Sequence, residues 1–296
     1  MSGVRAAAVP VESGPDAGAP WHYGDPYAEQ RALETGAALV DLSHRPVIAV
    51  SGPDRLTWLH SLTSQHLTAL PPRTWTQALI LSPNGHVEHH LTLVDDGTTV
   101  LAHVEPGSQD ALLEYLATMV FWSQVTITDV TADWAVVRGA DGDRLVPRPD
   151  LESVLDSAPG VAGLWAAEAL RVAARIPRLG FETDHRTIPA EVGWIDVAVH
   201  LDKGCYRGQE TVARVHNLGR PPRRMVLLHL DGSDASLPEH GDPLAIASEG
   251  ADSRSVGFVG TAARHYELGP IALALVKHSV PDDAALLAGG IPAAQD

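Results

Sequence analysis

The sequence PAEVGWIDVAVHLDKGCYRGQETVARVHNLGRPPRR occupies residues 189–224 and contains Cys205, the only cysteine of the 296-residue chain. It also contains Lys203, one of only two lysines among 21 basic residues, the other being Lys277. The chain therefore uses arginine wherever a generic positive charge is enough. The retained lysine indicates that an ammonium group is needed beside the cysteine.

The chemistry of Cys205 depends on its neighbours. A thiol acts as a nucleophile or a metal ligand only as thiolate, a form that cations such as Lys203 and Arg207 favour. Gly204 and Gly208 allow the backbone to approach a ligand closely or to adopt a positive φ. The helix predicted to follow would direct its positive end toward the thiol. A second interpretation stays open, because a lone cysteine is usually a small buried hydrophobe.

The charge of this stretch is opposite to that of the whole chain. A formal net charge of −16 at pH 7 argues against direct binding of nucleic acids or of acidic membranes. Between residues 203 and 224, six cationic side chains accompany one acidic side chain: Lys203, Arg207, Arg214, Arg220, Arg223 and Arg224, with Glu210. This basic segment is interpreted as a contact for an anion, and the alternative is a solvated helix face paired with acids elsewhere.

Apolar spacing predicts an α+β fold. The predicted strands cover residues 46–50, 77–81, 86–94, 98–104, 125–129 and 134–138. The predicted helices cover residues 55–65, 108–120, 151–155 and 166–174. From Met225 onward, the short apolar runs MVLLHL, PLAI, SVGFVGTAA and IALALVK are separated by Gly, Asp and Pro, which predicts a small β-barrel.

Composition places the chain among soluble globular proteins. Its hydrophobic content of 45% is ample for one large or two smaller cores, and no apolar run approaches the roughly 20 residues that span a bilayer. Residues 1–20, rich in Ala, Gly, Pro and acidic groups, are expected to form a disordered tail without a signal peptide. One cysteine allows no intrachain disulfide, so a reducing cytoplasm is expected.

The sequence lacks the common motifs for binding phosphates or dinucleotides and for paired-cysteine chemistry. The sequence has no GxxxxGK[ST] loop, no GxGxxG after a strand and no CxxC pair. His86, His89 and His90 invite a metal hypothesis, but on a strand His86 and His90 would share a face while His89 points away. Two protein ligands are fewer than zinc usually takes, so no metal site is predicted and strand histidines on a polar face are the favoured interpretation.

Residues 189–224 closely resemble the signature of the YgfZ branch of folate-binding proteins, which are relatives of the glycine-cleavage T protein, an aminomethyltransferase. The resemblance extends through GAALVDLSHRPVIAVSGPDRLTWLHSLTSQ (residues 36–65), LSPNGHV (81–87) and SVGFVGTAA (255–263). It implies an aminomethyltransferase-like folate-binding domain of antiparallel sheets with helices over residues 21–221, followed by a C-terminal β-barrel domain over residues 222–296. It also implies tetrahydrofolate or a derivative as cofactor.

The resemblance implies roles for individual residues. Cys205 would be the reactive centre, with Lys203 and Arg207 maintaining its thiolate character. Glu191 matches the position of a pterin-binding glutamate, because a carboxylate can accept two hydrogen bonds from a ring N–H and an amino group. Arg171 matches a family arginine after the central helix. The remaining candidates lie beside the cysteine: Tyr206 would stack or hydrogen-bond at the pocket, and Gln209 and Glu210 would fix the loop.

One departure from the family bears on activity. Where aminomethyltransferases have GGxxDD with a catalytic aspartate, this chain has GHVEHH (residues 85–90), and Glu88 is shifted by one residue. The favoured function is therefore a tetrahydrofolate-binding accessory factor for assembly or repair of iron-sulfur clusters. Its partners would be folate, cluster-assembly proteins and client enzymes such as tRNA-modifying methylthiotransferases. The alternative is a folate-dependent one-carbon transferase or demethylase that acts on a small amine.

Overall fold

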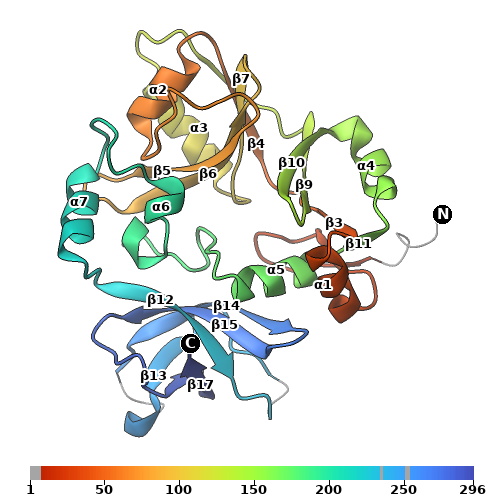
Figure 1. The fold of residues 1–296 in the computed structure, drawn as a ribbon, viewed down its shortest axis with the longest axis vertical. Helices are drawn as coiled ribbons and strands as arrows, with labels where there is room; N and C mark the ends of the chain where they lie inside the picture. The colour runs from red at the N-terminus through yellow and green to blue at the C-terminus, as the bar shows by residue number, and fades with distance from the viewer. Residues whose placement is uncertain (1–7, 234–235, 251–253) are drawn as a thin grey trace.

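Three structural units contain most of the described residues: two β-sheets with their helices, and a barrel (Figure 1). The computed structural model describes residues 8–233, 236–250 and 254–296. Within these residues, no helix combines the length and the apolar character that crossing a bilayer requires.

The first sheet is antiparallel and has the strand order β5-β6-β7-β4-β8. Its strands are β4 (Val47–Ser51), β5 (Trp75–Leu81), β6 (Val87–Asp95), β7 (Thr99–His103) and β8 (Thr126–Asp129). Alternate side chains of β6 are buried, as expected for a strand with one face against a core. That face packs against α2 (Arg55–Leu62) and α3 (Gln109–Thr118). His90 and Thr92 lie on the opposite face of β6, away from this core.

The second sheet has the strand order β10-β9-β3-β11, in which β11 runs parallel to β3. Its strands are β3 (Ala38–Asp41), β9 (Trp134–Gly139), β10 (Gly142–Pro147) and β11 (Gly160–Ala162), and its helices are α1 (Pro26–Glu34), α4 (Leu151–Ser157) and α5 (Leu164–Ala173). Helix α1 begins where it does because the Asp25 carboxylate accepts a hydrogen bond from the Ala28 N–H at 3.0 Å and Pro26 fits the first turn.

Strands after residue 222 close into a six-stranded barrel of order β12-β15-β14-β13-β16-β17, which confirms the predicted α+β fold with a C-terminal barrel. These strands are β12 (Arg223–Leu230), β13 (Pro243–Ile246), β14 (Gly257–His265), β15 (Gly269–Lys277), β16 (Leu286–Ala288) and β17 (Ile291–Gln295). Helix α5 lies between the second sheet and the barrel (Figure 1) and shares a core with β15 through Val172 and Leu273. The division into domains at residues 221 and 222 stays a prediction.

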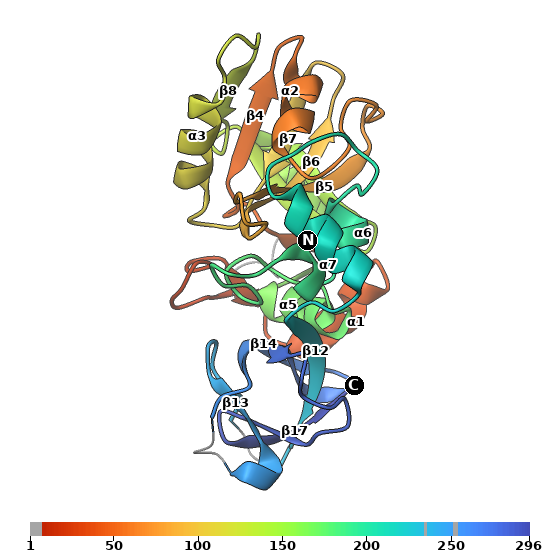
Figure 2. The same cartoon turned by 90° about the vertical axis from the view of Figure 1, so that its left-hand side faces the viewer.

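The segment that joins the first sheet to the barrel contains α6 (Ile195–Ala198) and α7 (Gln209–Leu218). Figure 2 shows both helices beside β5 and β6, above the barrel. The decisive stretch of sequence thus runs along the outside of the first sheet. It then enters the barrel as β12.

The expected disordered tail over residues 1–20 is wrong for residues 8–20, while residues 1–7 lie outside the described part. Strand β1 (Val9–Pro10) pairs with β2 (Pro20–His22), and Ala19 is buried. Composition misleads here because a single carboxylate, Asp16, is inserted among buried cations. It lies 2.9 Å from Arg178 and 3.0 Å from His44.

Candidate functional site

The loop around Cys205, residues 203–208, is held to the first sheet by two glycines. Gly208 has a φ of 82°, and a Cβ atom there would lie 2.6 Å from the carbonyl oxygen of Ser82 and 2.8 Å from the Cα of Gly85. A Cβ atom on Gly85 would in turn lie 2.7 Å from the Cβ of Thr211. The LSPNGHV and KGCYRGQE sequences therefore meet backbone to backbone, which only glycine permits. Gly204, in contrast, faces open space.

Lys203 fastens the other end of this loop. Its ammonium group donates to the carbonyl oxygens of His60, of Thr63 at 2.5 Å and of Gln65 at 3.1 Å. The helix predicted over residues 55–65 ends at Leu62, and these carbonyls belong to its last turn and the chain just beyond. Three convergent acceptors suit the three N–H groups of an ammonium better than a planar guanidinium. This geometry explains why lysine is retained here.

The cation at residue 203 is also partly desolvated. Burial lowers the pKa of Lys203 to about 8, whereas the three carbonyl contacts favour the ammonium form. Its Nζ lies 5.2 Å from the ring centroid of Tyr206, whose pKa is raised by burial. Lys203 is thus a clamp between the loop and α2. Its N–H groups are directed at backbone carbonyls and not at a thiolate.

Cys205 itself is exposed, so it is not the buried hydrophobe of the alternative interpretation. Next to it, the backbone N–H of Tyr206 donates to the side-chain oxygen of Gln209 at 3.1 Å, which is the loop-fixing contact expected of Gln209. The Tyr206 ring packs with Trp194 and Val212 in a buried cluster. Cys205 therefore lies on an ordered backbone and faces outward.

The two charged candidates that follow lie on the surface. Arg207 pairs with Glu88 at 3.2 Å, with about a third of each side chain exposed, and its guanidinium lies 5.7 Å from the Tyr115 ring centroid. Glu210 is exposed in the first turn of α7, where the helix dipole favours an acidic side chain. Neither residue is among those that line the cavity described next.

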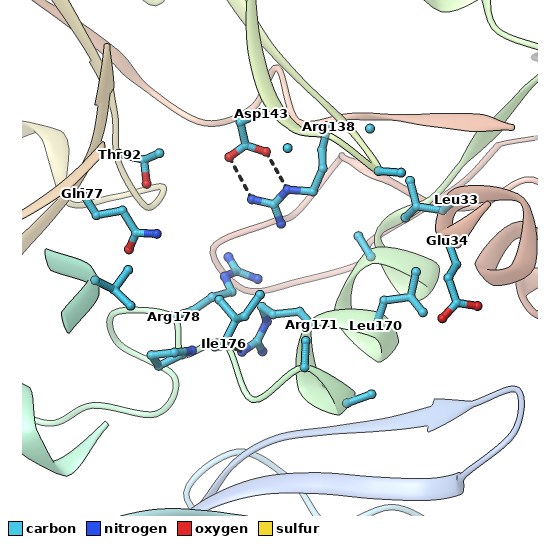
Figure 3. Close-up of a pocket in the computed structure, with 18 of the residues that line it drawn as sticks. Leu33, Glu34, Gln77, Thr92, Arg138, Asp143, Leu170, Arg171, Ile176 and Arg178 are labelled. Atoms are coloured by element: carbon cyan, nitrogen blue, oxygen red, sulfur yellow. Dashed lines mark hydrogen bonds and ion pairs between the residues drawn. The ribbon is translucent and has the colours of Figure 1, made fainter. Parts of the chain in front are cut away.

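A cavity of about 940 Å³ lies where the two sheets, α5, α6 and the tip of the β14–β15 hairpin meet. Figure 3 shows Gln77 and Thr92 of the first sheet on one side and Leu170 and Arg171 on another. Three exposed apolar side chains, Ile176, Val197 and Leu268, also line it. This size and apolar lining fit a small organic ligand.

Four arginines line the cavity, and each is paired with a carboxylate: Arg45, Arg138, Arg171 and Arg178. Asp143 binds Arg138 at 2.6 Å (Figure 3). Burial opposes ionisation of Glu168, but the charges of Arg171 and Arg178 outweigh it and lower the pKa of Glu168 to about 2. The cavity wall is therefore a network of buried ion pairs, held by residues from distant parts of the chain.

Of the predicted cofactor-binding residues, Arg171 alone reaches the cavity wall. All five of its N–H donors have partners: the carboxylates of Glu168 and Glu182, the Thr261 hydroxyl and the Ile176 carbonyl. No donor is left for a ligand. Because Thr261 belongs to β14, Arg171 ties α5 to the barrel.

Glu191 lies away from the cavity-lining residues, and it is buried. Its two carboxylate oxygens accept from Arg223 at 2.9 and 2.8 Å, and one also accepts from the Ile188 N–H at 3.1 Å. Arg223 also binds Asp184 at 2.6 Å. Burial lowers the pKa of Arg223, whereas its hydrogen bonds to Glu191 and Asp184 raise it, and the pKa lies above its ordinary value. The Glu191 carboxylate is thus already bound to Arg223, the first residue of β12.

Two cavity residues that the sequence did not single out as ligand contacts carry unused hydrogen-bonding atoms. The Nε of Arg45 is buried and has no partner among the described residues, although its Nη1 binds Glu105 at 3.0 Å. His90 lies 2.8 Å from the side-chain oxygen of Gln77 through Nε2 and stacks on Trp194 at 4.7 Å. His89 points to the opposite face, as predicted, with its ring 6.2 Å from that of Tyr115.

Strand β6 connects the cavity to the cysteine loop. Glu88, which pairs with Arg207, and His90, which lines the cavity, are two residues apart on β6, where the pairing register between β5 and β6 shifts. At about 3.3 Å per residue, their Cα atoms are about 7 Å apart along the strand. The two candidate sites are therefore neighbours, which the spacing of the motifs in the sequence did not predict.

Comparisons with known proteins agree with this architecture. Residues 8–140 match the family of the GCVT N-terminal domain. The mitochondrial iron-sulfur cluster assembly factor IBA57 homolog of Mycosarcoma maydis is 30% identical over 237 residues, which cover 64% of this chain and 56% of that protein. The aminomethyltransferase of Rubrobacter xylanophilus is 24% identical over 282 residues, or 78% of this chain and 75% of that protein.

The fold is shared with a solved structure, the glycine cleavage system aminomethyltransferase T from Bartonella henselae. The TM-score is 0.81 at 16% sequence identity, and the match covers 98% of this chain and 93% of that one. The fold is therefore that of an aminomethyltransferase. The matches to the GCVT N-terminal domain, to the IBA57 homolog and to the aminomethyltransferases support the resemblance to folate-binding relatives of the glycine-cleavage T protein that was found in the sequence. The chain spans little more than half the length of its Mycosarcoma maydis relative.

Proposed function

We propose that this protein is a tetrahydrofolate-binding accessory factor for the assembly or repair of iron-sulfur clusters, with Cys205 as its reactive centre. Its clients would include tRNA-modifying methylthiotransferases, and it would act in a reducing cytoplasm. The observation that carries the proposal is that strand β6 contributes His90 to the cavity and Glu88 to an ion pair with Arg207, two residues after the exposed Cys205. The assembly role is supported by the similarity to the IBA57 homolog.

The cavity has features that a folate requires. Its volume of about 940 Å³ is ample for a drug-sized molecule, and Ile176, Val197 and Leu268 offer apolar contact to flat rings. The unpartnered Nε of Arg45 is a buried donor that a polar ligand would satisfy. When bound, tetrahydrofolate would supply a carrier of one-carbon groups on its N5 and N10 nitrogens. The chain's own residues would orient it, through the apolar lining and Arg45, and exclude water from it.

Cys205 would act outside the cavity. A single cysteine cannot hold an iron-sulfur cluster alone, because such clusters normally take four protein ligands. The thiolate would serve either as one ligand at a site completed by the client or as a nucleophile toward it. The Lys203 clamp and the contact between Gly85 and Gly208 fix the backbone on either side of the thiol. Presentation of the thiol therefore needs little reordering when a client binds.

A one-carbon transferase or demethylase is the second candidate, and one observation favours it. Burial lowers the pKa of His90 to about 4, so its imidazole is neutral at physiological pH and can accept a hydrogen bond from a substrate amine in the cavity. The carboxylate nearest on the strand, Glu88, is exposed and bound to Arg207 instead. Formation of methylenetetrahydrofolate from a methylamine donor, lost in His90→Leu, would establish this activity. Its absence would leave the accessory role.

The accessory role is tested in cells whose only copy of this protein carries Cys205→Ala. The readout is the activity of a cluster-dependent tRNA methylthiolating enzyme, measured as the methylthiolated fraction of its tRNA. We expect a fall to the level of the deletion strain. Ser157→Ala, at an exposed position at the end of α4, is the control and should behave as wild type. Wild-type activity with Cys205→Ala at normal protein level would contradict the proposal.

A further inference from the structure

We propose that the Nε–H of Arg45 and the Nδ1 of His90 recognise a lactam edge of the ligand, meaning a ring carbonyl beside a ring N–H. This inference rests on the proposed folate binding and deepens it, because it assigns the contacts that would select the ring. It also replaces the role that the sequence gave to Glu191. Four observations lead to it.

The donor is Arg45. Its backbone N–H donates to the carbonyl of Leu42 at 2.9 Å, and its side chain is 7% exposed in the cavity wall. The Nη1 atom is bound to Glu105, so the side chain is fixed while Nε–H has no partner among the described residues. A buried donor without an acceptor costs free energy, which a ligand acceptor would recover. The donor is therefore preorganised for a ligand atom.

The acceptor is His90. An amide oxygen can only accept, so the 2.8 Å contact with Gln77 assigns the ring proton to Nε2. Nδ1 then carries the lone pair. Because burial lowers the pKa of His90 to about 4, this tautomer is neutral at pH 7 and its Nδ1 does not become a donor. Stacking on Trp194 fixes the plane of the ring.

Both residues line the same cavity, and Arg45 and Glu105 are close enough for their charges to act on the imidazole of His90. The positive charge of Arg45 is already balanced by Glu105 at 3.0 Å. The pair therefore offers one donor and one acceptor without a net charge. This pattern suits a neutral ring carbonyl with a neighbouring N–H and disfavours an anion.

The carboxylate of Glu191, which the sequence predicted to bind the pterin ring, already has partners in the protein. Both oxygens of Glu191 accept from Arg223, and Glu191 does not line the cavity. Arg171 has no free donor. Arg45 and His90, in contrast, each combine a side chain fixed through one nitrogen with a second nitrogen for which no bond is found among the described residues.

Two commercial ligands test the assignment. Folic acid has the ring carbonyl beside the N–H, whereas its 4-amino-4-deoxy analogue has an amino group beside a bare ring nitrogen. The donor and acceptor are thus inverted on that edge and nothing else changes. Titration calorimetry of the full-length protein at pH 7.5 should show folic acid binding at least about tenfold more tightly, as expected for mismatched buried hydrogen bonds.

Variants separate the two contacts. Arg45→Lys keeps the cation beside Glu105 but removes Nε–H, and we expect it to lose most of the preference. His90→Leu removes the acceptor and should lose it also, whereas His90→Asn places an amide oxygen near Nδ1 and should retain it. Thermal unfolding of each variant checks that it is folded.

The outcomes are distinct. Equal affinity of the wild type for both ligands, or an unchanged preference in Arg45→Lys and His90→Leu, would overturn the lactam-edge assignment and leave folate binding intact. Binding of neither ligand would overturn the folate part of the proposed function and this inference with it. A preference for folic acid that both substitutions abolish would support the assignment.

Discussion

Glu88 and His90 lie two residues apart on β6, so that one carboxylate holds Arg207 beside the cysteine loop while the neighbouring imidazole lines the cavity. Strand β6 therefore connects the cavity with the loop that contains Cys205.

Lys203→Arg should destabilise the protein although it preserves the charge. A planar guanidinium cannot direct three N–H groups at the carbonyls of His60, Thr63 and Gln65, and an unmatched buried acceptor costs about 1–3 kcal/mol. The free energy of unfolding, measured with urea, should fall by that amount. Lys277→Arg is the control, because Lys277 is bound to the single carbonyl of Ser255. Equal effects of the two substitutions would contradict the clamp.

Gly208→Ala should be more harmful than Gly219→Ala. Both glycines have positive φ, 82° and 66°, so both substitutions incur the left-handed cost of about 1–2 kcal/mol. Only at Gly208 would the new methyl also meet backbone, 2.6 Å from the Ser82 carbonyl oxygen, whereas Gly219 has open space. Chemical unfolding of both variants measures the difference. If Gly208→Ala is no worse than Gly219→Ala, the loop and the β5–β6 turn are not in contact.

Glu191→Gln separates a structural role from pterin recognition. The carboxylate pairs with Arg223, and removing its charge leaves a partly buried guanidinium with Asp184 alone. We expect the melting temperature to fall while the affinity for folic acid, measured below that temperature, changes less than threefold. A loss of affinity of tenfold or more, with unchanged stability, would instead restore the pterin-binding role that the sequence predicted for Glu191.

Stability should decrease as the pH falls from about 4.5 to about 2. Glu168 has a folded pKa of about 2 against an ordinary value of 4.5, so its contribution is present above pH 4.5 and is lost as the pH falls toward the folded value. A pKa shift of this size corresponds to a stabilisation of order 3 kcal/mol. Glu168→Gln should flatten the dependence of unfolding free energy on pH in this window. The same slope in the variant would show that other carboxylates account for it.

The sequence predicted the fold well where the signal was local. The alternation of β6, the helices near residues 109–118 and 164–173 and the apolar runs of the barrel all follow from periodicity. The N-terminal segment was mispredicted because Asp16 is stabilised by Arg178, 162 residues away. Composition contains no sign of such a contact.

The candidate site was predicted less completely, for a similar reason. The KGCYRGQE motif identified the exposed cysteine and the need for an ammonium, but not that Lys203 would bind the end of α2, about 140 residues earlier. Arg45 lay within a recognised stretch, yet its unpartnered Nε is visible only once Glu105 is placed beside it. Glu191 matched a family position, but Arg223 of the following barrel occupies it. Such pairings depend on the tertiary structure.

The central claim is that the cavity and Cys205 form one functional unit, and the lone cysteine makes it directly measurable. The measurement is the rate of alkylation of Cys205 by iodoacetamide at pH 7.5, without ligand and with saturating 5-formyltetrahydrofolate. A ligand that contacts His90 should order β6 and, through Glu88 and Arg207, the loop, so we predict a rate at least about twofold lower. Glu88→Gln should reduce that effect. An unchanged alkylation rate, with ligand binding confirmed by calorimetry, would contradict the claim.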